Sequence, residues 1–208
     1  MPVFARSTTV VAHPDSIDAG IRHVQNEVMP MLADLPGCVG LSMLVDRQSR
    51  RCIVTSSWQS ESDMRATEAQ LHAVRTRAAE ALGGRPQVDE WEIAALHRNH
   101  RSQHGACVRS TWFRVDPPKL DRAVDVFKLA SLPELEALEG FCSASLMIDR
   151  ESGIAVSSVT YDSFSAMERT RSAAGTIREA GTAEAGADVL EVCEFDLTLA
   201  HLHVPELV

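Results

Sequence analysis

The sequence contains no run of about 20 uninterrupted apolar residues, the length that a membrane-spanning helix requires. Its first residues, Met1-Pro2-Val3-Phe4-Ala5-Arg6, do not show the basic-then-apolar order of a signal peptide. We therefore expect a cytoplasmic protein with no membrane partner. Apolar residues still make up 45% of the 208 positions, which is enough for a packed core.

Metal-binding and redox motifs are also missing. The five cysteines are odd in number and show no C-x-x-C spacing, so we expect buried thiols and neither a disulfide framework nor a zinc ribbon. Histidines recur at 97, 100 and 104 and at 201 and 203, but no cysteine or carboxylate is spaced along the chain to complete a metal site. The sequence therefore predicts no metal and no cofactor. The cysteines are Cys38, Cys52, Cys107, Cys142 and Cys193.

Positive charge is scarce. The formal net charge is −9, and the one basic cluster is the short segment 98–105, so we expect no nucleic-acid partner. There is no glycine-rich phosphate loop, no nucleophile elbow and no pair of carboxylates placed for acid–base work. These absences exclude the commonest enzyme classes that a motif can reveal.

What the sequence does contain is an internal repeat. A shift of 103 positions aligns landmark residues along most of the chain, and the last strand needs a slip of one further residue. A constant shift means few insertions, so both halves should share one backbone plan. The aligned pairs include Pro14 and Pro117, Pro30 and Pro133, Gly37 and Gly140, Asp46 and Asp149, and Ser60 and Ser163.

Each copy shows the same order of expected elements. Strands are expected at 4–12, 38–45, 52–58 and 87–97, and again at 107–115, 141–148, 154–161 and 188–199, with helices after the first and third strand of each copy. Pro30 and Pro133 should kink the first helix of their copies. The second helix of the second copy is rich in glycine, so we expect it to be shorter or looser.

The order β-α-β-β-α-β is the split-βαβ, ferredoxin-like motif. One such unit leaves one sheet face bare, and two units in a chain can cover it by facing each other. The expected fold class is therefore α+β, with two tandem ferredoxin-like units that form an intrachain dimeric α+β barrel. The expected domains are 1–97 and 106–208, joined by a linker at 98–105.

Four segments resemble the antibiotic biosynthesis monooxygenase family, which has this barrel fold. They are Val3-Phe4-Ala5, the corner Leu35-Pro36-Gly37-Cys38-Val39-Gly40, the hairpin around 46–50, and Trp58-Gln59-Ser60. The resemblance implies cofactor-independent oxygenation of aromatic or quinol-like substrates, haem degradation, or no known activity. Family chains usually hold one copy and close the barrel as homodimers, whereas a tandem chain would close it internally.

The haem-degrading branch of that family is not favoured. Its pattern calls for an asparagine on the first strand, where this chain has Ser7 and Ser110. It also calls for a tryptophan where this chain has Thr67 and Thr170, and His72 lies several residues early in its helix. These differences argue against haem degradation, and haem binding without degradation is kept only as the least favoured hypothesis.

Alternation along the strand at 38–45 assigns two faces. Val39, Leu41, Met43 and Val45 should pack under the helices, and the face with Ser42 should line the barrel, as should Ser145 in the second copy. Hydroxyl side chains of the neighbouring strands, and one arginine in each copy, are assigned to the same face. The pairing register of strand 52–58 could reverse the assignment of the residues on that strand. Such a lining would bind an apolar ligand, or its members could bond to each other. The residues added to this face are Arg6, Thr8, Thr55, Ser57, Arg109, Thr111, Ser158 and Thr160.

Three catalytic candidates follow. Arg6 and Arg109, if buried, need an anionic partner, which a phenolate or carboxylate ligand could supply, and surface acids are the alternative. His72 is a candidate base, since cofactor-free oxygenation needs a deprotonated substrate. Trp58 and Tyr161 hold equivalent positions and could wall an aromatic pocket or anchor helix packing.

The leading hypothesis is a cofactor-independent, monooxygenase-like protein that acts on a small aromatic or polyketide-like molecule. The alternative is a non-catalytic barrel that binds a ligand or serves in assembly. The expected partners are a small-molecule ligand and, for the tandem chain as a whole, a second copy in a homodimer.

Overall fold

The computed structural model describes residues 2–204 and 206–207. Across these residues eight strands follow one closed hydrogen-bonding order, β1-β3-β2-β8-β5-β7-β6-β4, and helices make up the rest of an α+β fold. The chain divides into two compact units, Met1–Trp91 with Leu197–Val204, and Glu92–Asp196 with Pro205–Val208. Strands β4 (Gln87–Arg98) and β8 (Asp188–Leu202) each supply residues to both units.

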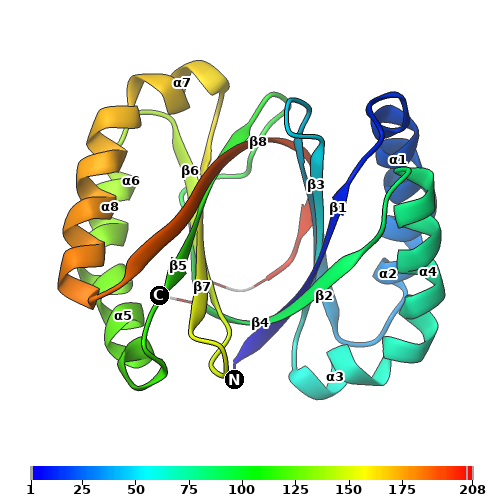
Figure 1. Cartoon of the computed structure of the whole chain (residues 1–208), viewed down its shortest axis with the longest axis horizontal. Helices are drawn as coiled ribbons and strands as arrows, with labels where there is room; N and C mark the ends of the chain where they lie inside the picture. The colour runs from blue at the N-terminus through cyan, green and yellow to red at the C-terminus, as the bar shows by residue number, and fades with distance from the viewer. Residues whose placement is uncertain (1, 205, 208) are drawn as a thin grey trace. The chain divides into compact units, whose positions relative to one another are not determined.

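In the first unit, helices α1, α2 and α4 cover one face of the sheet that contains β1, β3 and β2 (Figure 1). The buried core lies between them and includes Val10, Val24, Met43 and Leu82. The elements are β1 Val3–Val11, α1 Ile17–His23, α2 Met29–Ala33, β2 Cys38–Asp46, β3 Arg51–Trp58, α3 Glu61–Ala66 and α4 Glu68–Ala81.

The second unit has the same arrangement, with α5, α6 and α8 over β5, β7 and β6 (Figure 1). Its elements recur at residue numbers 103 higher, as the turns at Pro14–Ser16 and Pro117–Lys119 show. The elements are β5 Cys107–Arg114, α5 Leu120–Val126, α6 Leu132–Glu136, β6 Phe141–Ile148, β7 Ile154–Tyr161, α7 Phe164–Arg169 and α8 Arg171–Ala185.

The predicted proline kinks are confirmed as π-helical turns. Val24–Val28 joins α1 to α2 with Pro30 in the next turn, and Phe127–Ser131 joins α5 to α6 ahead of Pro133. Proline has no backbone N–H to donate and its ring crowds the preceding turn, so the helix widens there instead of ending. The same solution in both halves follows from the same residue at the same position.

The prediction that the second helix of the second half could be shorter is wrong. Helix α8 has 15 residues and α4 has 14, so the glycine-rich helix is not the shorter one. Ala174 and Ile177 anchor α8 in the core, which offsets the low helix propensity of glycine. Gly181 also has a packing role, because a Cβ there would lie 2.6 Å from Ser131 Oγ.

Strand register corrects the predicted faces of the first unit. Leu41 pairs with Ser56, and Ser56 pairs with Arg6, so all three lie on the helix-covered face. Ser42 pairs with Thr55 on the opposite face, which Ser57 shares by alternation. The prediction that Arg6 and Thr8 share the face of Ser42 is therefore wrong, because both line the helix-covered side of the sheet.

The second unit repeats the correction. Leu146 pairs with Ser157, and Ser157 pairs with Thr111, on the helix-covered face that also carries Arg109. Ser145 and Ser158 pair on the opposite face. The prediction that the apolar residues of β2 and β6 pack under the helices is confirmed, since Leu41, Met43 and Leu146 all belong to the two cores.

Among the described residues, no helix is long and apolar enough to cross a membrane.

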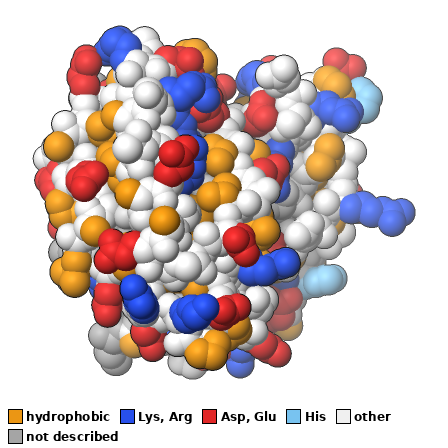
Figure 2. Space-filling view, turned by 60° about the vertical axis from the view of Figure 1, so that its left-hand side comes forward, with side chains coloured by type: hydrophobic (Ala, Val, Ile, Leu, Met, Phe, Trp, Pro, Cys, Tyr) orange, Lys and Arg blue, Asp and Glu red, His pale blue; other side chains and the backbone are white. Residues whose placement is uncertain are grey.

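Acidic and basic side chains are interspersed over the face in Figure 2, where neither sign gathers into a broad patch. Arg150 illustrates the pairing, because it binds Glu92 at 2.6 Å and Asp121 at 2.9 Å. The segment between β4 and β5 comprises residues 99–106, whereas the linker predicted from the sequence is 98–105, so Arg98 belongs to β4.

Candidate functional site

The second unit contains a cavity of about 90 Å³ between its helices and its sheet. Helices α5, α6 and α8 form one wall and strands β5, β6 and β7 form the other. Most of the lining is aliphatic or aromatic, with Phe113, Phe127 and Ile177 among it. Drug-sized pockets measure about 300–1,000 Å³, so this cavity suits a ligand no larger than a single ring.

Arg109 is the charged group at the sheet side of this cavity and is 5% exposed. Its Nε donates to Glu194 at 2.9 Å, and its Nη2 donates to the Met167 carbonyl at 3.0 Å. Nη2 also forms the ion pair with Glu194 at 2.8 Å. The third nitrogen, Nη1, is buried and finds no hydrogen-bond partner among the described residues.

Tyr161 is the neighbour of Arg109 in the cavity wall. The Arg109 Cζ atom lies 5.7 Å from the centroid of the phenol ring, which is fully buried. Burial raises the pKa of the Tyr161 hydroxyl, and the nearby Arg109 guanidinium opposes that rise. Although Arg109 and Thr170 lie close enough to act on this pKa, the described part of the chain offers Tyr161 Oη no hydrogen bond of normal geometry. We call Arg109 Nη1 and Tyr161 Oη the anchor pair.

The equivalent arginine of the first unit is fully partnered. Arg6 donates to Glu90 at 3.0 and 2.5 Å and to the Met64 carbonyl at 3.2 Å, and its Nη1 lies 2.9 Å from Glu68. The position of Glu68 is held by Arg171 in the second half, which cannot accept from a guanidinium. Arg6 Nη1 therefore has both Glu68 and the Met64 carbonyl as partners, whereas in the second unit the Met167 carbonyl accepts from Nη2 of Arg109 and Nη1 is left without either.

The cavity of the first unit is also smaller, at about 50 Å³. Trp58 replaces the tyrosine, and its indole N–H donates to Ser56 Oγ at 3.0 Å inside the core. Trp58 is absent from the described lining of this cavity, whereas Tyr161 lines the other. Arg75 Nη1 is the buried nitrogen that lacks a partner here among the residues described. The two halves are therefore unequal as binding sites.

The structure does not bring His72 to either cavity. Leu71 and Val74 face the core, so the helical repeat turns His72 outwards, where it is exposed. It is absent from the described lining of the first cavity, where Arg6 lies. The predicted pairing of His72 with Arg6 as base and ligand anchor is therefore corrected.

The predicted hydroxyl ligands divide between the two sheet faces. Thr8 and Thr111 line the cavities with the arginines. Ser158 on the opposite face forms a hydrogen bond of 2.8 Å with Ser110, in line with the alternative that such hydroxyls bond to each other. The members of that opposite face are Ser42, Thr55, Ser57, Ser145, Ser158 and Thr160.

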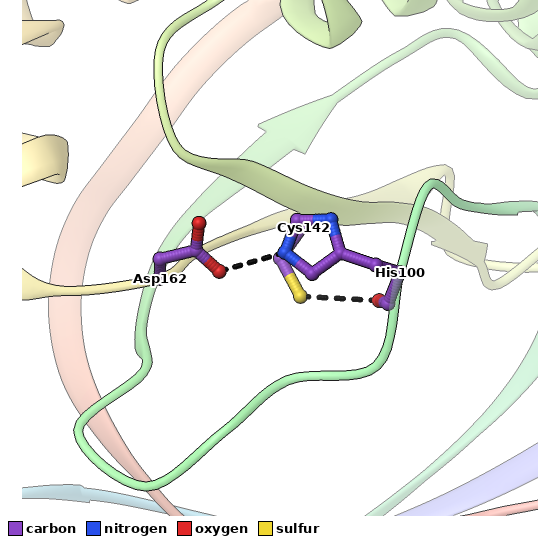
Figure 3. A group of neighbouring side chains, drawn as sticks. All are labelled: His100, Cys142 and Asp162. Carbon is purple, nitrogen blue, oxygen red and sulfur yellow. Dashed lines mark hydrogen bonds and ion pairs between the residues drawn. The ribbon is translucent and has the colours of Figure 1, made fainter.

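A second group of reactive side chains was missed in the sequence. His100, Cys142 and Asp162 meet at one end of the second unit's sheet, and their ligand atoms lie within 4.8 Å of one another (Figure 3). His100 Nε2 lies 2.7 Å from Asp162 Oδ1. Spacing along the chain cannot reveal this group, because its members come from the loop after β4, from β6 and from the residue after β7.

The chemistry of the second cavity is set by its titratable groups. Among the described lining residues these are Arg109, Tyr161 and Arg178, and none is a histidine or a carboxylate. The site can therefore hold an anion and donate hydrogen bonds, but a substrate would have to arrive already deprotonated or lose its proton to solvent.

No family model matches the chain. It is 53% identical to Uncharacterized protein Rv2557 of Mycobacterium tuberculosis strain H37Rv over 206 residues, which cover 99% of this chain and 92% of that protein. It is 52% identical to Uncharacterized protein Rv2558 of the same strain over 207 residues, which cover 99% of this chain and 88% of that protein. The chain belongs to the family of these mycobacterial proteins.

Solved structures with the same fold share little sequence with the chain. A Lactobacillus acidophilus protein, provisionally assigned as a monooxygenase, superposes with a TM-score of 0.72 at 9% identity, covering 98% of this chain and 97% of that one. An anthrone oxidase-like protein has a TM-score of 0.69 at 14% identity, covering 100% and 95%. LmHde, a haem-degrading enzyme from Listeria monocytogenes, has a TM-score of 0.52 at 12% identity, covering 93% and 98%. These likenesses show a monooxygenase-like fold.

Proposed function

We propose that the second unit binds a small aromatic anion, a phenolate or an aromatic carboxylate, in the cavity between its helices and sheet. The anchor pair carries this proposal. A buried donor without a hydrogen-bond partner destabilises the folded protein by about 1–3 kcal/mol, and by more when the donor is charged. A ligand that supplies an acceptor would remove this cost, and its binding would be favoured accordingly. One anionic oxygen placed between Arg109 Nη1 and Tyr161 Oη would satisfy both groups.

The rest of the lining defines the ligand. Aliphatic and aromatic side chains surround the cavity, so the ligand body is apolar and only one end of it is charged. At about 90 Å³ the cavity accommodates one ring, and a fused polyketide would require the helices to move. The recurrence of the element order, at a shift of 103 for all but the last strand, supports a duplicated β-α-β-β-α-β unit, of which one copy has the larger cavity.

A second candidate function is cofactor-independent oxygenation of such an anion. The likeness to an anthrone oxidase-like protein favours it at the level of the fold. Arg109 would stabilise the phenolate, the form of a phenol that reduces dioxygen, and the apolar walls would exclude water. No role in this reaction falls to His72, because its side chain lies on the exposed side of α4.

Isothermal titration with benzoate tests the binding function. We expect benzoate to bind, benzyl alcohol to bind at least tenfold more weakly, and Arg109→Met to weaken benzoate by about 10- to 100-fold, since a charge-assisted hydrogen bond contributes about 1.5–3 kcal/mol. Arg6→Met is the matched control, because it also breaks a buried ion pair but lies in the other unit.

The proposal fails if benzoate and benzyl alcohol bind equally, or if Arg6→Met and Arg109→Met have the same effect. Tyr161→Phe provides a second variant with an unchanged ring, and a fewfold loss of benzoate affinity is expected from it. For the oxygenase, uptake of dioxygen in the presence of a dihydroxybenzene should exceed the rate in buffer and should be lost in Arg109→Met.

A further inference from the structure

Three metal-binding side chains converge outside the cavity, at the opposite end of β7 from the hairpin. His100 and Asp162 are 42% and 46% exposed, and Cys142 lies fully buried beneath them. Figure 3 shows the imidazole and the carboxylate facing each other with the thiol next to them. Imidazole, thiolate and carboxylate are the three side-chain ligands that zinc prefers.

The geometry points to a site for one zinc-type divalent cation, held by His100, Cys142 and Asp162, with its fourth position open to solvent. In a tetrahedral zinc site the ligand atoms lie about 3–4 Å apart, given metal–ligand distances of about 2.0–2.3 Å. The three ligand atoms here lie within 4.8 Å of one another, so small changes of side-chain rotamer are enough to close the site.

The contacts argue for a cation rather than a nucleophilic cysteine. A Cys–His nucleophile needs the thiol to donate to the imidazole. Here Cys142 Sγ instead donates to the backbone carbonyl of His100 at 3.3 Å, and the imidazole nitrogen binds the carboxylate.

The first unit supplies an internal comparison. The positions related to Cys142 and Asp162 by the shift of 103 are Val39 and Gln59, which carry neither a thiol nor a carboxylate. A backbone contact is nevertheless preserved, with His203 N donating to the Val39 carbonyl at 2.7 Å and Asn99 N and His100 N donating to the Cys142 carbonyl at 2.9 and 3.4 Å. The fold therefore does not require Cys142 or Asp162, and both additions to the second half are metal ligands.

Cobalt(II) is the probe for the test, because a cysteine thiolate bound to it gives a near-ultraviolet charge-transfer band. We expect the chelator-treated full chain to bind one equivalent of Co²⁺ with that band, and one equivalent of Zn²⁺ to remove it. Cys142→Ala should lose the band. Cys52→Ala, which changes an equally buried thiol in the first unit, should keep it.

His100→Ala and Asp162→Asn change exposed side chains, so they test the site even if the Cys142→Ala variant does not fold. Each should lower Co²⁺ affinity by at least about tenfold, since one of three protein ligands is lost. Absence of the charge-transfer band in the wild-type chain would overturn the proposal, leaving an ion pair above a core cysteine. Persistence of the band in Cys142→Ala would overturn it as well.

Discussion

Arg6 and Arg109 occupy equivalent positions on β1 and β5, yet their guanidinium groups differ in how fully they are bonded. Both are buried and both bind a glutamate, Glu90 or Glu194. Two differences distinguish them: Arg171 stands at the position equivalent to Glu68, and the Met167 carbonyl accepts from Nη2 of Arg109 whereas the Met64 carbonyl accepts from Nη1 of Arg6. The loss of these acceptors leaves Nη1 of Arg109 without a hydrogen-bond partner among the described residues, and this nitrogen is the basis of the proposed binding site.

The hydroxyl of Tyr161 should contribute nothing to stability in the absence of ligand. Tyr161→Phe removes a buried oxygen that has no hydrogen-bond partner within the described structure and leaves the ring packing in place. We expect the free energy of unfolding to stay the same or to rise by up to about 1–3 kcal/mol. Urea denaturation followed by circular dichroism measures it.

Trp58→Phe is the control at the equivalent position of the first half. It loses the indole hydrogen bond to Ser56 and leaves a void in the core, so a loss of about 1–3 kcal/mol is expected. A Tyr161→Phe variant that is destabilised as much as Trp58→Phe would show that the phenol oxygen is bonded after all, and would remove the basis of the anchor pair.

The sequence alone singles out both arginines and leaves open whether a ligand or an acidic side chain is the anionic partner, and in the structure Glu90 and Glu194 take that place. It cannot show which sheet face they occupy, because a shift of one residue in the pairing of β3 reverses every side chain. The sequence also cannot show that Glu68 contacts Arg6, because the two residues are 62 positions apart. The difference in hydrogen bonding between the Arg6 and Arg109 guanidinium groups is therefore visible only in the folded structure.

Elements are better predicted than side-chain groups. The π-helical turns next to Pro30 and Pro133 depend on a residue within about one turn of the feature that it causes. The group of His100, Cys142 and Asp162 depends on three separate segments, which is why histidine spacing alone suggested no metal site.

Gly140 and Gly105 provide a matched pair at this scale. Both have a positive φ, 73° and 92°. Alanine at either position must adopt a left-handed backbone conformation, which lowers the free energy of unfolding by about 1–2 kcal/mol. At Gly140 the new Cβ would also lie 2.6 Å from the Cβ of Ala166 in α7, whereas at Gly105 it would meet nothing within 4 Å. We expect Gly140→Ala to cost about 1–3 kcal/mol more than Gly105→Ala in urea denaturation. Equal losses would show that α7 yields to the added methyl group.

At the scale of the whole molecule, neither compact unit is continuous in sequence. The first unit includes Leu197–Val204, where Thr198 Oγ1 donates to the Met43 carbonyl at 3.0 Å. The second unit includes the end of β4, where Leu96 pairs with Ser145 on β6. The domain boundaries predicted from the sequence, 1–97 and 106–208, therefore differ from those of the compact units, because each half of the chain supplies a strand segment to the unit that consists mainly of the other half.

This exchange predicts how the chain behaves when it is cut in its loop. A fragment of residues 1–105 lacks the β8 segment that pairs with its β2, and a fragment of residues 106–208 lacks the β4 segment that pairs with its β6. Since a sheet edge with open hydrogen bonds and a bare apolar face is unstable, neither fragment should be a folded monomer. An equimolar mixture should form a 1:1 complex with the circular dichroism of the intact chain. Light scattering coupled to size exclusion measures this, and a stable, folded monomer of either fragment would mean that the exchanged strand segments are dispensable.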